Sequence, residues 1–154
     1  MPKLYMMIGV PGSGKSTWIG KNKNQSALIA SSDAFIDRKA ESEGKTYNDV
    51  FASHIKAANQ YALQVARQAF DLNLDLIWDQ TNINRKSRAA KLAMVPAHYE
   101  KIAVYFPTPS TDEHERRLAS RPGKQIPAHI MKSMVGALEA PTVDEGFDRI
   151  IVVN

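Results

Sequence analysis

Residues 9–16 read GVPGSGKS, a glycine-rich segment that ends in a lysine and a serine. Just before it, residues 3–10 (KLYMMIGV) form a short apolar run, as expected of a strand buried in a parallel sheet. Glycine at positions 12 and 14 would let backbone amides turn inward around a phosphate chain. Lys15 could then reach the β- and γ-phosphates of ATP, Ser16 could ligate Mg²⁺, and the following helix would present its positive end. The segment therefore predicts a phosphate-binding loop. The residues expected at the nucleotide are Gly9, Pro11, Gly12, Ser13, Gly14, Lys15, Ser16 and Thr17.

Apolar runs recur along the chain and alternate with helical patterns. Four further runs, at residues 27–30, 74–78, 101–106 and 149–153, predict strands. The clearest helical stretch is residues 46–72, where Thr46 with Asp49 resembles a capping start. Its apolar stripe consists of Phe51, Ile55, Ala58, Ala62, Val65 and Ala69. The alternation predicts an α/β fold with a mostly five-stranded parallel sheet flanked by helices, and ligands beyond the carboxyl ends of the strands.

The bulk composition limits the classes of protein to consider. A chain of 154 residues suits one domain, residues 1–154. It has no run of about 18 apolar residues and no signal-peptide pattern, so we expect no membrane partner and a cytoplasmic location. The absence of cysteine excludes disulfides and thiolate metal sites. The net charge of +4 suits polyanionic partners, among them nucleotides and nucleic acid.

Two aspartates directly follow predicted strands. Asp33 comes after the second run, where a carboxylate could accept the proton of an acceptor hydroxyl or could instead cap the next helix. Asp79 ends the third run (LDLIWD), where it could hold Mg²⁺ together with Ser16, contact the acceptor, or make a local turn. Both are candidates for the acceptor side of the site.

A polar segment follows Asp79 and opens another helix. Thr81 and Asn82 lie at the predicted cleft, and Arg85 and Arg88, three residues apart, share one helix face. These four side chains are candidates for binding the acceptor and its phosphates. The alternative is that the arginines form a solvated face.

A basic segment punctuated by glycine and proline, residues 116–127, predicts a lid that spans about residues 111–138. Arg117 and Arg121 could offset the charge that builds up on a transferring phosphoryl group, or could be solvated helix residues. The histidines show no ligand-type spacing and are expected to be ordinary surface or helix residues. They are His54, His98, His114 and His129.

Five motifs in order resemble one family. GVPGSGKST, SSDAF, DQTN, RRLASRPGKQIP and a MKSM helix together resemble the kinase domain of bacteriophage polynucleotide 5'-hydroxyl kinase. The resemblance implies that Lys15 and Ser16 bind the donor phosphates and Mg²⁺, Asp33 is the general base, and Arg121 stabilises the transferring phosphate. Arg117 would be its companion, and Asp79 would help to place the acceptor nucleotide. The terminal EGFDRIIVV resembles a loop and strand of such kinases, in which the loop lies near the adenine.

Two departures from this family affect the expected acceptor. The family arginine that contacts the acceptor 3'-phosphate is replaced by Ile36, and Arg38 would be rotated about 200° away on a helix. We also expect no 3'-phosphatase activity, because no segment here resembles the phosphatase domain often attached to this kinase. The resemblance implies a nucleic acid acceptor, most simply a 5'-hydroxyl end. The replacement of the family arginine by Ile36 leaves two alternatives, a hydroxymethylated base or a small molecule such as a nucleoside. A nucleotide switch that transfers nothing is the alternative of another class.

Overall fold

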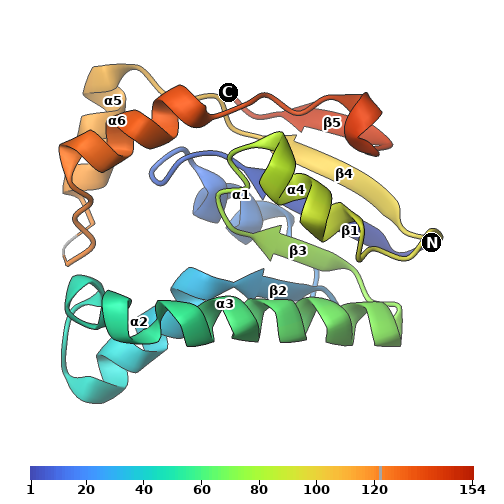
Figure 1. The fold of residues 1–154 in the computed structure, drawn as a ribbon, viewed down its shortest axis with the longest axis horizontal. Helices are drawn as coiled ribbons and strands as arrows, with labels where there is room; N and C mark the ends of the chain where they lie inside the picture. Colours follow the sequence, from blue (N-terminus) through green and yellow to red (C-terminus); the bar gives the residue numbers. More distant parts are fainter. Residues whose placement is uncertain (122) are drawn as a thin grey trace.

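Five parallel strands form the centre of the molecule (Figure 1). The computed structural model describes residues 1–121 and 123–154, and the strand order is β2-β3-β1-β4-β5. The predicted α/β fold is therefore confirmed. The strands are β1 (Lys3–Ile8), β2 (Leu28–Ser31), β3 (Leu76–Asp79), β4 (Glu100–Tyr105) and β5 (Arg149–Val152).

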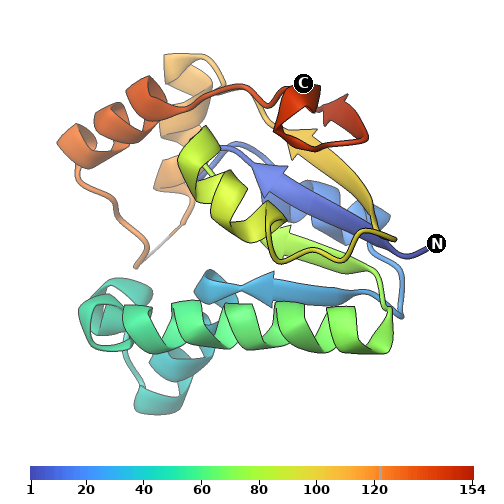
Figure 2. The ribbon, with the colours of Figure 1, turned by 45° about the vertical axis from the view of Figure 1, so that its right-hand side comes forward.

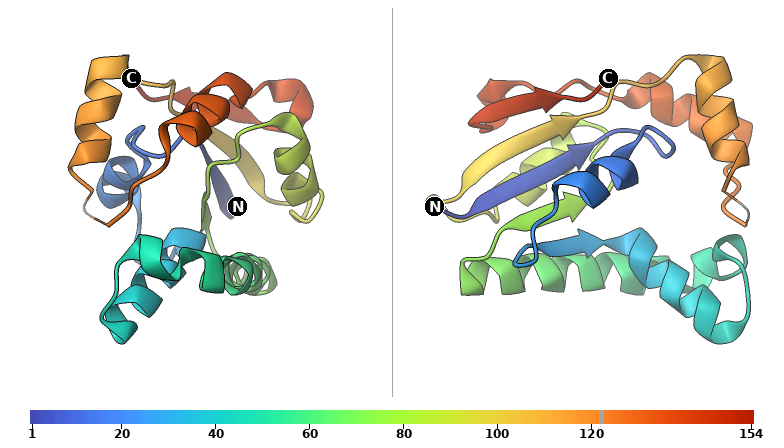
Figure 3. Two further views of the ribbon diagram at one scale, coloured as in Figure 1. Left: turned by 60° about the vertical axis from the view of Figure 1, so that its left-hand side comes forward. Right: turned by 180° about the vertical axis from the view of Figure 1, so that it is seen from behind.

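Helices cover both faces of this sheet (Figure 3). Leu4, Met6 and Ile8 of β1 pack in one cluster with the alanines of the long helix and with Leu92. Met7 points to the opposite face and packs in a second cluster with Ile19. The helices are α1 (Lys15–Asn22), α2 (Ser32–Glu43), α3 (Tyr47–Leu72), α4 (Arg85–Leu92), α5 (Thr111–Ala119) and α6 (Ala128–Ala137), with a 3₁₀ turn η1 (Val143–Glu145).

Helix α3 begins with the capping box that the sequence predicts. The Thr46 side chain accepts from the Asp49 amide, and the Asp49 carboxylate accepts from the Thr46 amide. Buried alanines let the helix approach the sheet closely, as expected from its apolar stripe. Phe51 departs from that stripe, because it is 40% exposed and faces a cavity instead of the core.

The predicted lid corresponds to α5, α6 and their connection. Figure 2 shows these helices above the carboxyl ends of the strands, with the connection reaching toward the start of α3. The Asn48 amide of α3 donates to the carbonyl of Gly123 at 2.9 Å. Pro122, which contributed to the prediction of a lid, lies outside the described residues. Within the described part of the chain, we find no helix with the length and apolar character needed to cross a membrane.

Candidate active site

A cavity of about 1480 Å³ lies beyond the carboxyl ends of β1, β2 and β3. The phosphate-binding loop, the starts of α2 and α3, and the lid all contribute to its wall. The parallel topology explains this convergence, since all of these strands end at the same edge of the sheet. The predicted site residues that line it are Pro11, Gly12, Ser13, Gly14, Lys15, Ser16, Thr17, Asp33, Asp79, Thr81, Arg117 and Arg121.

Glycines shape the phosphate-binding loop at two positions. Gly12 and Gly14 have φ values of 78° and 108°, in the left-handed region that side chains rarely adopt. Gly9, in contrast, packs behind the loop, where a Cβ would lie 2.6 Å from Ser13 Oγ and 3.0 Å from Phe106 Cβ. The lack of a side chain at Gly9 therefore allows close packing, and its expected contact with the nucleotide stays a prediction.

Lys15 is held against the loop by main-chain carbonyls. Its Nζ donates to the Gly9 carbonyl at 2.6 Å and to the Val10 carbonyl at 3.1 Å. Burial lowers the pKa of Lys15 to about 8, although the charges of Asp79 and Asp33 act in the opposite direction. The lysine thus lies at the cavity with its ammonium bonded to main-chain carbonyls, a setting that a phosphate chain would complement.

Asp33 projects from the first turn of α2 onto the cavity. The N-cap of this helix is Ser31, whose Oγ accepts from the Ala34 amide at 3.2 Å. Capping therefore does not explain Asp33. Its Oδ1 accepts a hydrogen bond of 2.5 Å from the hydroxyl of Tyr47, the first residue of α3. Sequence reasoning missed Tyr47, because nothing in the sequence indicates that the starts of α2 and α3 meet.

Asp79 ends β3 and pairs in register with Ser31 of β2. Burial raises the pKa of Asp79, the charge of Lys15 opposes this shift, and the charge of Asp33 adds to it. The Asp79 carboxylate and the Ser16 hydroxyl both line the cavity. They are oxygen donors of the kind Mg²⁺ prefers, with the remaining positions left for phosphates and water. The donor set therefore fits a nucleotide-bound Mg²⁺.

Arginines in α5 and just after it lie near the phosphate-binding loop or line the cavity. Arg117 Nε pairs with Glu113 at 2.8 Å, and its Nη1 lies 3.5 Å from the Gly12 carbonyl. Arg121 also lines the cavity. His114 was expected to be an ordinary surface or helix residue, but it is only 6% exposed and its Nε2 donates to the Pro11 carbonyl at 2.8 Å. It joins the lid helix to the phosphate-binding loop.

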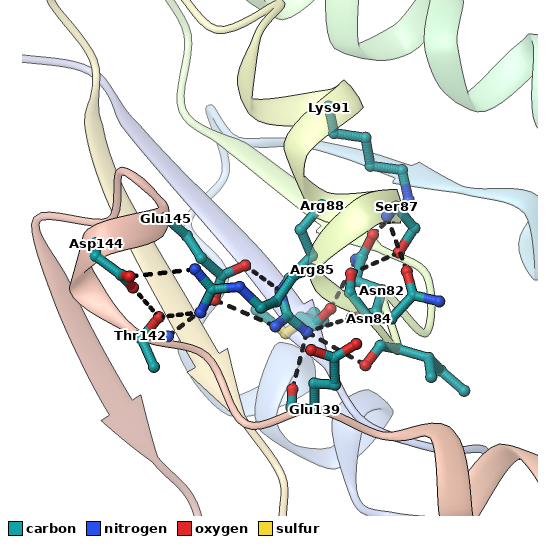
Figure 4. Close-up of polar contacts among 12 residues, drawn as sticks. Asn82, Asn84, Arg85, Ser87, Arg88, Lys91, Glu139, Thr142, Asp144 and Glu145 are labelled. Carbon is teal, nitrogen blue, oxygen red and sulfur yellow. Dashed lines mark hydrogen bonds and ion pairs between the residues drawn. The ribbon is translucent and has the colours of Figure 1, made fainter.

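Arg85 and Arg88 are both engaged by the segment around η1 (Figure 4). They are not among the described residues that line the cavity, so the structure does not support their predicted binding of acceptor phosphates. Arg88 is fully buried, pairs with Glu145 at 2.8 Å, and donates to the carbonyls of Asn82 and Glu139. Arg85 donates to the segment around η1, at Thr142 and Asp144. Both guanidiniums therefore hold the chain between α6 and β5.

Asn82 also has a structural role, so its expected contact with the acceptor is wrong. It is 3% exposed, and its amide donates to the Met7 carbonyl at 2.7 Å. Its side-chain oxygen accepts from Lys91. The EGFDRIIVV segment differs from expectation too. Among the described residues that line the cavity, those near this end of the chain are Val153 and Asn154, after β5, and not the loop before it.

The part of the cavity wall formed by α3 and α6 differs in character from the phosphate-binding loop. Ile36 is fully buried between α2 and α3, and the Arg38 guanidinium lies over the ring of Tyr61 at 5.3 Å. Lys124 does line the cavity, and its Nζ pairs with Asp37 at 2.8 Å. Apolar side chains form much of this wall, among them Phe51, Ile55, Ile130 and Met134.

Comparison with known proteins identifies the fold. A family model described as an AAA domain matches residues 4–141. A protein from Chloroflexus aurantiacus assigned as a kinase has a TM-score of 0.69 at 17% identity, over 99% of this chain and 87% of that chain. A sugar kinase from Janibacter sp. has a TM-score of 0.61 at 21% identity, over 99% and 85%. A chain of the Pnkp1/Rnl/Hen1 RNA repair complex has a TM-score of 0.65 at 20% identity, over 89% of this chain but 44% of that chain. The chain has the fold of P-loop kinases.

Proposed function

Because the chain belongs to the AAA domain family and has a P-loop kinase fold, we propose that it transfers the γ-phosphoryl group of ATP to a hydroxyl group. One observation carries this proposal. A phosphate-binding loop with Lys15, a carboxylate at Asp33 and two lid arginines all line the same cavity. A switch that only binds nucleotide would not need the carboxylate or the arginines in cis.

Asp33, Lys15 and the two lid arginines each have a distinct role in the proposed transfer. The acceptor oxygen attacks the γ-phosphorus, its proton passes to the Asp33 carboxylate, and the bond to the β-phosphate oxygen breaks to release ADP. Orientation of the hydroxyl is the larger contribution of Asp33, since an ordinary carboxylate is a weak base. Lys15, Arg117 and Arg121 offset the charge on the phosphoryl oxygens. Ser16 and Asp79 would hold Mg²⁺, which would supply positive charge against that of the nucleotide phosphates.

For the acceptor, we propose a hydroxyl of nucleic acid, most simply a 5'-hydroxyl end of DNA or RNA. The motif resemblance supports this choice, as does the likeness to a chain of an RNA repair complex. The net charge of +4 is compatible with it.

A small-molecule hydroxyl, such as that of a nucleoside, is the second candidate. The apolar part of the cavity wall favours it, because the buried Ile36 stands where the family has an arginine and Arg88 pairs with Glu145 away from the cavity. A strand end presents further phosphates, which Phe51 and Ile130 would not bind.

Label transfer distinguishes these acceptors. Each acceptor is incubated with γ-labelled ATP: 5'-hydroxyl oligonucleotides of DNA and RNA, a duplex containing hydroxymethyluracil, and free nucleosides. We expect label on the oligonucleotides. Label on the nucleosides alone would reject a polymeric acceptor, and label on none of them would reject the proposed transfer.

The lowered pKa of Lys15 predicts that ATP binding weakens above about pH 8. Nucleotide phosphates should raise the pKa of Lys15, so the lysine takes up a proton on binding wherever it is neutral in the free protein. With a free pKa of about 8, Kd for ATP should rise about tenfold between pH 7 and pH 9. Calorimetric titration at both pH values measures it. A K15M variant is the control, since it should bind more weakly but lose this pH dependence. An equal Kd at both pH values in the wild type would contradict the proposed binding of the nucleotide phosphates by Lys15.

A further inference from the structure

The hydroxyl of Tyr47 forms a direct link between two helix starts at the edge of the cavity. It donates to Oδ1 of Asp33 across 2.5 Å, from the first residue of α3 to the first turn of α2. Burial raises the pKa of the Tyr47 phenol, and the hydrogen bond to Asp33 raises it further. The phenol therefore stays a hydrogen-bond donor. One of the two carboxylate oxygens of Asp33 is engaged by it.

The other side of the Tyr47 ring faces the lid. Lys124 Nζ lies 5.0 Å from the ring centroid and 2.8 Å from an oxygen of Asp37, one helical turn after Asp33. The ring also lies 5.6 Å from that of Phe51. Tyr47 is thus placed between the carboxylate and a lid cation.

The next residue, Asn48, fastens the lid at the same point. Its side chain donates to the Gln125 carbonyl at 2.6 Å and accepts from the Gln125 amide at 2.6 Å. Its own amide donates to the Gly123 carbonyl at 2.9 Å. The lid therefore contacts the Tyr47 ring through Lys124 and the neighbouring residue Asn48 through Gln125 and Gly123.

We propose that Tyr47 is a positioning residue for Asp33. By holding Oδ1, it leaves Oδ2 to accept the proton of the acceptor hydroxyl, and it prevents rotation that would exchange the two oxygens. The docked lid keeps the phenol in this place through Lys124 and Asn48. Tyr47 neither donates nor receives the transferred proton. This inference rests on the proposed function, in which Asp33 accepts that proton.

A Y47F variant tests the inference, because it removes the hydroxyl and keeps the ring against Phe51 and Lys124. Single-turnover transfer from γ-labelled ATP to a 5'-hydroxyl oligonucleotide, or to a nucleoside if that is the acceptor labelled, should slow about 10- to 100-fold. KM for ATP should stay unchanged, since the substitution does not alter the phosphate-binding loop. Y61F is the matched control: Tyr61 lies on the same helix, its ring centroid lies 5.3 Å from that of Phe35, and the variant should keep the full rate.

A double variant separates positioning from a general structural role. In a D33A background, Y47F should cause no further loss, because Tyr47 acts only through Asp33. Equal rates for Y47F and the wild type, or an equal loss in both backgrounds, would overturn the inference. If Y47F does not fold, K124M serves in its place. The K124M change should slow transfer by the otherwise wild-type protein and leave the rate of the D33A variant unaltered. A loss of rate in both backgrounds would overturn the inference. A D33A variant as fast as the wild type would instead reject the proposed function, as would absence of label on any acceptor.

Discussion

Replacing Asp33 with alanine should lower kcat for phosphoryl transfer by about 10²- to 10⁴-fold, the range expected for loss of a positioned general base. The acceptor hydroxyl would lose both its proton acceptor and the group that orients it. Binding of ATP should persist, because the phosphate-binding loop and Lys15 are separate from the start of α2. Steady-state kinetics with a labelled acceptor and a separate ATP titration measure the two quantities.

Asp71 provides a control for this variant. It is an exposed aspartate in the last turn of α3, far along the helix from the cavity, and D71A should keep the wild-type rate. If D33A kept more than about a third of the wild-type kcat, well outside the range for a lost general base, Asp33 would not have the role assigned to it.

Replacing Arg88 with methionine should reduce the free energy of unfolding by about 3–5 kcal/mol, the usual cost of breaking a buried ion pair by removing one partner. Arg88 is fully buried and the Glu145 side chain is 5% exposed. Burial alone would raise the pKa of Glu145, but hydrogen bonds from Arg88 and Thr142 hold it below its usual value. R88M would remove the Arg88 donor from this carboxylate and from the carbonyls of Asn82, Ile83 and Glu139. Urea unfolding followed by circular dichroism measures the change.

Arg85 is a close control, because it lies on the same helix and pairs with Asp144 of the same segment. Both partners of that pair are largely exposed, at 44% and 71%, so R85M should lower the free energy of unfolding much less than R88M does. A similar unfolding free energy for R88M and the wild type would show that the buried pair does not hold the segment between α6 and β5.

The sequence predicted those parts of the site whose chemistry lies in one continuous segment or at strand ends. Residues 11–17 were expected at the nucleotide and do line the cavity, because the geometry of this loop is local to the segment. Asp33 and Asp79 were found because a parallel sheet brings the carboxyl ends of its strands to one edge. The lid boundaries followed from glycine, proline and the basic residues around them.

The errors concern side chains whose direction depends on distant segments. Arg88 was expected at the cleft, but its partner Glu145 lies 57 positions further along the chain, and no local pattern reveals that contact. His114 reaches Pro11 across 103 positions, and Tyr47 reaches Asp33 only because α2 and α3 pack at their ends. Helix periodicity predicts which residues share a face, but it does not predict what that face meets.

The most direct test of the central claim is a crystal structure with a non-hydrolysable ATP analogue and a bound acceptor. The account predicts phosphates in the loop at Lys15 and an acceptor hydroxyl at about 2.6–3.2 Å from an oxygen of Asp33, in line with the γ-phosphorus. Triphosphate in that loop with the acceptor hydroxyl outside hydrogen-bond reach of Asp33, and instead beside another carboxylate such as Asp79, would contradict it.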